Sequence, residues 1–200
     1  MVDAPTNHAL RVLAKLGIAR SSDLEARGVS RVQLVRLVRR GLVERLARGL
    51  YVAAGHALTA EHTLAHVARR VPSAVFCLLT ALRFHELTTQ MPAEVWIALP
   101  SKARAPRLEN VRLRVVRFSG AALEEGVERH RVENVEIRVY SAAKTVADCF
   151  KYRNKVGVDV AVEALRDYSR SHRGGANELA HFAGICRVAR VMQPYLDSIA

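Results

Sequence analysis

The feature that most constrains the fold is a short helix pattern that ends at a glycine and runs directly into a hairpin pattern. Ser30 is a favourable N-cap for a helix over residues 31–40, and Gly41 follows where helices commonly end. The apolar residues that share one face of this helix are Leu34, Val38 and Leu42. The polar side chains predicted to point the other way are Gln33, Arg36 and Arg40, with Arg39 on the flank. This pattern predicts a helix with one buried side and one basic side.

The hairpin pattern consists of two β-rich stretches, residues 42–46 and 50–52, joined by the turn Ala47-Arg48-Gly49. Gly49 can adopt the positive φ that a tight hairpin turn requires. Two further helices are predicted before Ser30, over residues 7–16 and 23–26. Three helices followed by a hairpin are the plan of a winged helix-turn-helix, so we predict such a domain over residues 1–56.

The pattern changes after a hinge at Ala54-Gly55-His56. Helices are predicted over residues 60–70, 74–87, 142–153, 158–169, 177–189 and 194–199. Strands are predicted over residues 94–99, 111–118, 127–132 and 135–140, and the alternation in 111–118 predicts one solvated basic face. The predicted class is therefore α+β: the winged helix is followed by a second domain at 58–200, with a small mixed sheet and C-terminal helices.

The charge of the chain points to an anionic partner. The net charge is +12, and Arg supplies 26 of the 31 basic residues. Residues 1–56 hold ten basic residues against four acidic ones, so half of the net charge lies in little more than a quarter of the chain. The planar guanidinium donates two parallel hydrogen bonds to phosphate or to guanine. This distribution predicts that the first domain binds nucleic acid.

The position of each polar residue predicts its part in binding double-stranded DNA. Contacts to base edges come mainly from the N-terminal half of the second helix of a helix-turn-helix, and the candidates there are Ser30, Arg31, Gln33 and Arg36. Contacts to phosphate orient the protein without reading sequence, and the candidates are Arg39, Arg40, Arg45 and Arg48. Two alternatives stay open: a basic face that is merely solvated, and a winged helix that serves as a protein-binding adaptor.

An enzyme, for example one acting on DNA, is the third alternative, and the sequence offers it little support. A metal-dependent nuclease needs Glu-x-Lys beside a further carboxylate, and none of the five lysines has an acidic residue two positions before it. His62 and His66 could share a metal at i,i+4 spacing, but no third ligand is evident. No phosphate-binding glycine loop or nucleophile motif is present. We therefore predict no catalysis, no metal and no cofactor.

Cysteine usage and hydropathy indicate where the protein resides. Cys77, Cys149 and Cys186 are odd in number and far apart, and each has apolar neighbours, which predicts buried thiols in a reducing compartment. Apolar runs such as residues 73–82 are far shorter than the roughly 18 residues that span a bilayer. The N-terminus has no signal-peptide pattern. The expectation is a cytoplasmic protein without membrane association.

The segment Ser30-Arg-Val-Gln-Leu-Val-Arg-Leu-Val-Arg-Arg-Gly41, followed by Arg45-Leu-Ala-Arg-Gly-Leu-Tyr51, resembles the N-terminal domain of AbiEi-type antitoxins. These proteins regulate bacterial abortive-infection (type IV) toxin–antitoxin operons. Residues 73–87 and the motif Val139-Tyr-Ser-Ala-Ala-Lys-Thr-Val-Ala-Asp148 resemble parts of the family's second domain. His85-Glu86 departs from the family, where a small residue such as Gly is more usual.

The resemblance implies a transcriptional autoregulator that binds repeats in its own promoter and opposes a nucleotidyltransferase-type toxin. The second domain would then carry antitoxicity or self-association, and binding to repeated sites would favour a homodimer or a cooperative assembly on DNA. Thr145 and Asp148 recur in the family motif, but we interpret them as local hydrogen bonding at a helix start below Ser141 rather than as catalytic groups.

Overall fold

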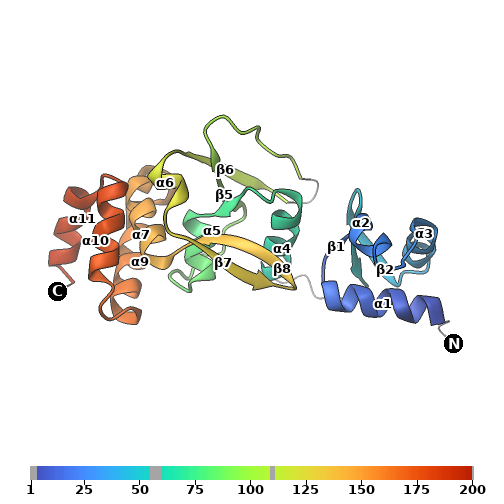
Figure 1. The fold of residues 1–200 in the computed structure, drawn as a ribbon. Coiled ribbons are helices and arrows are strands. Elements are labelled where there is room, and N and C mark those ends of the chain that lie inside the picture. Colours follow the sequence, from blue (N-terminus) through green and yellow to red (C-terminus); the bar gives the residue numbers. More distant parts are fainter. Residues whose placement is uncertain (1–3, 55–59, 109–110, 200) are drawn as a thin grey trace. The chain divides into compact units, whose positions relative to one another are not determined.

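The computed structural model describes residues 4–54, 60–108 and 111–199. The chain divides into two compact units, one formed by Met1–Pro72 with Arg131–Ile137 and the other by Ser73–His130 with Arg138–Ala200. Helices and strands occur in both units, which confirms the predicted α+β class (Figure 1). The predicted hinge at 54–56 and the start of the second domain at 58 fall largely on residues 55–59, outside the described residues.

The first unit begins with three helices and a small sheet. The elements are α1 (Ala4–Leu16), β1 (Ala19–Arg20), α2 (Ser21–Glu25), α3 (Arg31–Arg39), β2 (Val43–Ala47), β3 (Leu50–Ala53) and α4 (Ala60–Arg70). The three strands are antiparallel in the order β1-β3-β2, and the β2–β3 pairing shifts register between Arg45 and Ala47. The helices and the hairpin thus lie where the sequence predicts them.

A compact apolar core holds these elements together. Leu13 of α1, Leu24 of α2 and Leu34 and Leu37 of α3 are fully buried, and Val43 of β2 packs with them. Each of these helices is too short to be stable alone in water, so burial of one apolar face supplies most of its stability. The core therefore determines which side of α3 faces solvent.

The second unit contains a mixed sheet with the strand order β6-β5-β4-β8-β7. Its strands are β4 (Val75–Phe76), β5 (Val95–Pro100), β6 (Leu113–Phe118), β7 (Val127–Val132) and β8 (Val135–Tyr140). β4 pairs antiparallel with β5 and parallel with β8, and β5 pairs parallel with β6. The tip of the β7–β8 hairpin, Arg131–Ile137, is grouped with the first unit, and its turn residues Glu133 and Asn134 both have positive φ.

Helices make up the rest of the second unit. They are α5 (Leu78–Phe84), α6 (Ala121–Glu124), α7 (Ala142–Lys151), α8 (Arg153–Val156), α9 (Val158–Ser171), α10 (Ala176–Ile185) and α11 (Ala189–Asp197). Helix α7 is buried from Ala142 to Phe150 and packs against α5, α9 and α10. Figure 1 shows α7, α9, α10 and α11 side by side beyond the sheet. Cys77, Cys149 and Cys186 are buried free thiols in this unit, as predicted.

Three sequence predictions in this unit need correction. The predicted helix over 74–87 contains the central strand β4 and begins only at Leu78, because an unbroken apolar run does not distinguish a buried strand from a helix. The last helix begins at Ala189 and contains Pro194 instead of starting there. The arginines of β6 are exposed but do not share one face, since Arg114 and Arg117 are three residues apart on a strand that alternates every residue.

Candidate nucleic-acid interface

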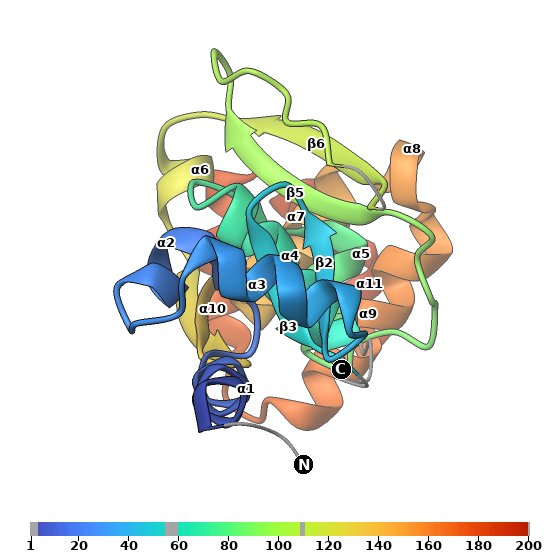
Figure 2. The ribbon, with the colours of Figure 1, turned by 90° about the vertical axis from the view of Figure 1, so that its right-hand side faces the viewer.

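Helix α3 is defined at both ends by local interactions that the sequence predicts. The Ser30 side-chain oxygen accepts a hydrogen bond from the Gln33 backbone nitrogen at 3.2 Å, which satisfies one free amide of the first turn. Gly41 follows the helix with φ +68°, a conformation that glycine adopts without strain. Leu34 and Leu37 anchor the helix in the core. Figure 2 shows α3 facing the viewer.

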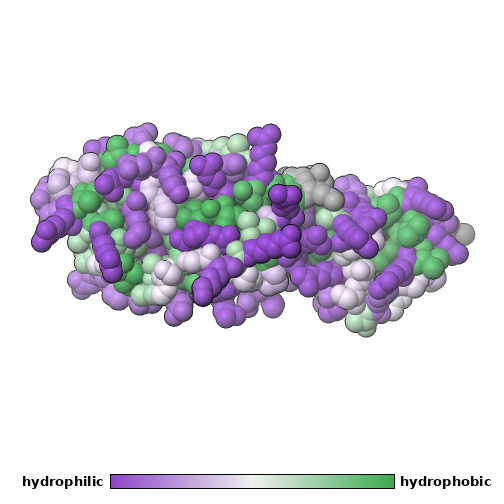
Figure 3. Space-filling model, turned by 90° about the horizontal axis from the view of Figure 1, so that it is seen from above, coloured by the Kyte–Doolittle hydropathy of each residue, from purple (hydrophilic) through white to green (hydrophobic). Residues whose placement is uncertain are grey.

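The outer face of α3 combines arginines with two exposed valines. Arg36, Arg39 and Arg40 are exposed, and within the described parts of the chain no hydrogen bond or ion pair occupies their guanidinium groups. Val32 is 62% exposed and Val35 is 48% exposed. In Figure 3 an apolar patch lies among hydrophilic side chains on the first unit. This face is therefore both cationic and locally apolar.

Two predicted base-contact candidates have partners within the protein. Arg31 is exposed, but its Nε lies 2.6 Å from a carboxylate oxygen of Glu25. Gln33 is half-buried, and its side-chain nitrogen donates to the Pro5 carbonyl oxygen at 2.7 Å, so α1 holds its amide at the edge of the outer face. Ser30 is exposed and serves as the N-cap.

The hairpin carries the other two predicted cations. Arg45 is exposed, and its Nε donates to the Ala47 carbonyl oxygen at 3.3 Å across the register shift in β2. Arg48 is exposed in the turn between β2 and β3, where Gly49 has φ +76°. The carbonyl oxygen of Arg48 accepts from Arg70, whereas its guanidinium makes no hydrogen bond or ion pair among the described residues. The hairpin thus presents positive charge at its turn.

The acidic groups of α2 are neutralised by arginines of the same unit. Glu25 pairs with Arg31, and Asp23 pairs with Arg69 at 2.7 Å. Arg20 also donates to the Arg69 carbonyl oxygen, which holds the start of α2 and the end of α4 together. Because both α2 carboxylates are paired, they weaken the positive potential of α3 less than free carboxylates would.

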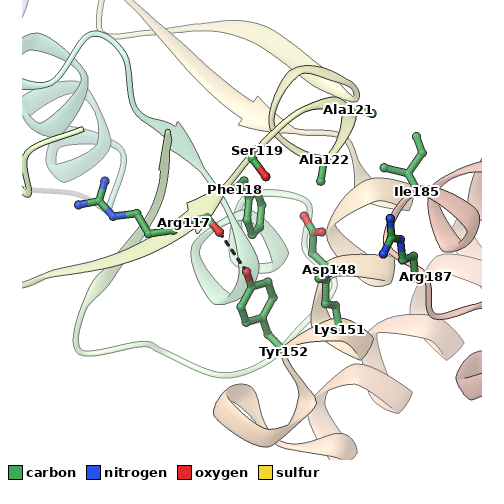
Figure 4. A pocket seen from close by; sticks show the side chains of 10 residues that line it. All are labelled: Arg117, Phe118, Ser119, Ala121, Ala122, Asp148, Lys151, Tyr152, Ile185 and Arg187. Carbon is green, nitrogen blue, oxygen red and sulfur yellow. Dashed lines mark hydrogen bonds between the residues drawn. The ribbon is translucent and has the colours of Figure 1, made fainter. Parts of the chain in front are cut away.

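A second region, in the other unit, contains a pocket. The pocket has a volume of about 410 Å³ and is lined by Asp148, Lys151, Arg187 and seven other residues (Figure 4). The guanidinium of Arg117 extends away from the other side chains (Figure 4). Asp148 accepts from Lys144 Nζ at 2.6 Å and from the Cys186 thiol at 3.1 Å. Both carboxylate oxygens are therefore occupied within the fold.

The buried pair of Lys144 and Asp148 escaped the sequence analysis. Ser141 caps α7 and Thr145 donates to the Tyr140 carbonyl oxygen, so the interpretation of local hydrogen bonding at the helix start is confirmed for Thr145. Asp148 instead forms an ion pair with Lys144, and both side chains are buried away from water. Burial raises the pKa of the Asp148 carboxyl group above its usual value, and Lys144 opposes this shift. A Lys and an Asp four residues apart in a largely apolar helix were the signal available in the sequence.

The histidines considered as metal ligands are buried in the first unit. His62 Nδ1 lies 3.1 Å from a carboxylate oxygen of Glu133, and burial lowers the pKa of His66. Within residues 4–54, 60–108 and 111–199, no three His, Cys, Asp or Glu side chains come together as a metal site. Nor does any helix in those ranges have the length and apolar character needed to cross a bilayer.

The N-terminal part of the chain thus combines three short helices, a basic outer helix face and a basic hairpin. Residues 9–54 match the family described as "Transcriptional regulator, AbiEi antitoxin". This match confirms the resemblance found in the sequence over the segment that it covers. No curated protein matches the chain.

The fold of nearly the whole chain resembles a solved structure. The crystal structure of the RV2827C protein from Mycobacterium tuberculosis superimposes with a TM-score of 0.64 at 15% sequence identity. The alignment covers 92% of this chain and 72% of that chain. At this level of identity the likeness establishes a shared fold and carries no information on activity.

Proposed function

We propose that the N-terminal elements form a winged helix-turn-helix that binds double-stranded DNA, with α3 in the major groove and the β2–β3 hairpin against the backbone. The observation that supports this most is the outer face of α3, where Arg36, Arg39 and Arg40 are exposed without partners among the described residues. The major groove, about 12 Å wide, admits a helix. Guanidinium groups on the helix can then donate two hydrogen bonds to guanine or to phosphate.

The proposed biological role follows from the family match. A DNA-binding chain of this family would act in the cytoplasm as an autoregulating antitoxin that binds promoter repeats and opposes a nucleotidyltransferase-type toxin. In this proposal the chain binds and regulates, and it catalyses no reaction. Repeated operator sites would be occupied by a dimer or by a cooperative assembly, because neighbouring proteins on one duplex come into contact.

The proposal is tested by binding of the full chain to the duplex upstream of its own gene and to a random duplex of equal length, at one stated salt concentration. Specific sites are bound about 10³-fold or more tightly than random DNA. Arg36→Ala should lose about 1–3 kcal/mol on the upstream duplex if Arg36 contacts a base. Fluorescence anisotropy measures both affinities.

Arg166→Ala is the matched control, because Arg166 is an exposed arginine of α9 in the other unit. This variant should bind both duplexes as the wild type does. Equal affinity of the wild type for the two duplexes would show that the protein binds DNA without sequence specificity. No binding to either duplex would favour the adaptor alternative, in which the basic face contacts an acidic protein.

A further inference from the structure

Helix α3 exposes two valines, Val32 and Val35, to solvent in the part of the chain that the structure describes. Only four large apolar residues of the described chain are substantially exposed, namely Val32, Val35, Met91 and Val158. Two of these four lie on one nine-residue helix. Valine is also a weaker helix former than Ala, Leu, Glu or Lys, so neither stability nor solubility accounts for valine at these positions.

The two valines lie together on the surface of the helix. Residues three apart on a helix are neighbours on the same face, so Val32 and Val35 form one small apolar patch. At 100° per residue, Arg39 falls between the two valines around the helix axis, Arg31 lies beyond Val35, and Arg36 lies beyond Val32. The patch is therefore bordered by cations on both sides.

The patch occupies the part of α3 that faces base edges in a helix-turn-helix. Val32 and Val35 are the second and fifth residues of the helix, and base contacts come from its N-terminal residues. The major groove offers one apolar group, the C5-methyl of thymine, which small apolar side chains contact. The side chain of valine has a single strongly preferred rotamer in a helix, so its methyl groups are already ordered before binding.

We propose that Val32 and Val35 read thymine methyl groups in the major groove, so that the preferred site contains thymine opposite the N-terminal half of α3. This inference rests on the proposed DNA binding and adds the base that α3 selects. The bordering arginines favour a polyanion over an apolar protein surface as the occupant. Interfaces between proteins also depend mainly on Trp, Tyr and Arg anchors rather than on small aliphatic residues.

The test replaces thymine by uracil in the preferred upstream duplex, one position at a time, which removes only the methyl group. For the wild-type chain, affinity should fall about fourfold for each methyl group that a valine covers. Val32→Ala and Val35→Ala should weaken binding to the thymine duplex by a similar factor. Each variant should then bind the thymine and uracil duplexes equally at the position that its valine contacts. The reason is that truncating the valine and removing the thymine methyl group abolish the same contact.

Val158→Ala is the matched control, because Val158 is 44% exposed on α9 in the other unit. This variant should keep the wild-type sensitivity to uracil. Circular dichroism should show that all three variants are folded, since each replaces a solvent-exposed side chain.

Four results would overturn the inference. A wild-type chain that binds uracil and thymine duplexes equally refutes methyl reading while leaving the proposed DNA binding intact. Alanine variants as sensitive to uracil as the wild type show that other residues contact the methyl groups. Valine variants that shift the monomer–dimer equilibrium in sedimentation without DNA, while keeping wild-type DNA affinity, assign the patch to self-association. A wild-type chain that prefers no duplex refutes the proposed function and this inference together.

Discussion

Lys144 and Asp148 bring two charged groups into a helix that is buried from Ala142 to Phe150. The side chains are 0% and 1% exposed, and Lys144 Nζ also lies 4.3 Å from the ring centre of Tyr140 and 4.8 Å from that of Phe118. Removing two charges from water is costly, and their mutual attraction offsets this cost only while both partners are present. The pair is thus a place where a single substitution has a much larger effect than a double one.

Replacing one partner should destabilise the protein strongly. Lys144→Met or Asp148→Leu leaves an uncompensated buried charge and should lower the free energy of unfolding by about 3–5 kcal/mol. The double substitution removes both charges and should restore the stability to within about 1–2 kcal/mol of the wild type. Urea denaturation of the three variants measures these changes. Additive losses in the double variant would show that the two residues do not act as a pair.

The residues of the candidate interface were predictable in part. The exposure of Arg36, Arg39, Arg40, Arg45 and Arg48 follows from helical and strand spacing, and the structure has these residues exposed.

The two valines and Gln33 were not predictable, because five of the nine residues of α3 are apolar. Such a helix has more apolar positions than its packed face can hold. A shift of that face by one position exchanges a buried residue for an exposed one. Packing against β2 and the rest of the core decides which residues of α3 are buried, and the spacing within α3 carries no information on these contacts.

At the scale of elements, α3 depends on its cap as well as on its core. The Ser30 hydroxyl oxygen accepts a hydrogen bond from the Gln33 backbone amide. A helix of nine residues is also too short to be stable without tertiary contacts. The start of the helix is also the part proposed to approach base edges. Its local stability therefore bears directly on binding.

Ser30→Ala should loosen the first turn of α3. Loss of an N-cap serine costs about 1 kcal/mol, which corresponds to roughly fivefold faster amide exchange where exchange occurs by local opening. Hydrogen exchange of the α3 amides measures the effect. Ser22→Ala in α2 is the control, because Ser22 is exposed and makes no side-chain cap. Unchanged exchange in α3 would show that the core alone fixes this turn.

Elements with a clear period were predictable, and short or fully apolar ones were not. The helix α4 and the strands β5 and β8 lie within one or two residues of their predicted bounds. The strand β4 has only two residues, and it exists because Val75 pairs with Ala98 while Phe76 pairs with Ile97 and Val139. These partners are distant in sequence, so no local pattern could reveal the strand.

At the scale of the whole molecule, charge is distributed unevenly. The chain carries +12, and residues 1–56 account for half of it. Positive charge gathered on one segment attracts polyanions and releases condensed counterions when DNA binds. The affinity for any duplex should therefore fall steeply as salt rises.

Arg48→Ala should weaken binding to upstream and random duplexes by the same factor, because a phosphate contact carries no sequence information. The slope of log affinity against log salt should become shallower by about one. Titrations at four salt concentrations measure the slope, and Arg173→Ala is the control, because Arg173 is an exposed arginine of the second unit. A selective loss on the upstream duplex would place Arg48 at a base instead.

The three cysteines have a practical consequence. All of them lie in the second unit, and burial raises the pKa of the Cys77, Cys149 and Cys186 thiols, that of Cys186 to about 12. A neutral, inaccessible thiol does not react with an alkylating reagent, so labelling requires local or global unfolding that exposes the thiol. The rate of alkylation would thus report opening of the second unit alone. It would give no information on the helices of the first unit that are proposed to bind DNA.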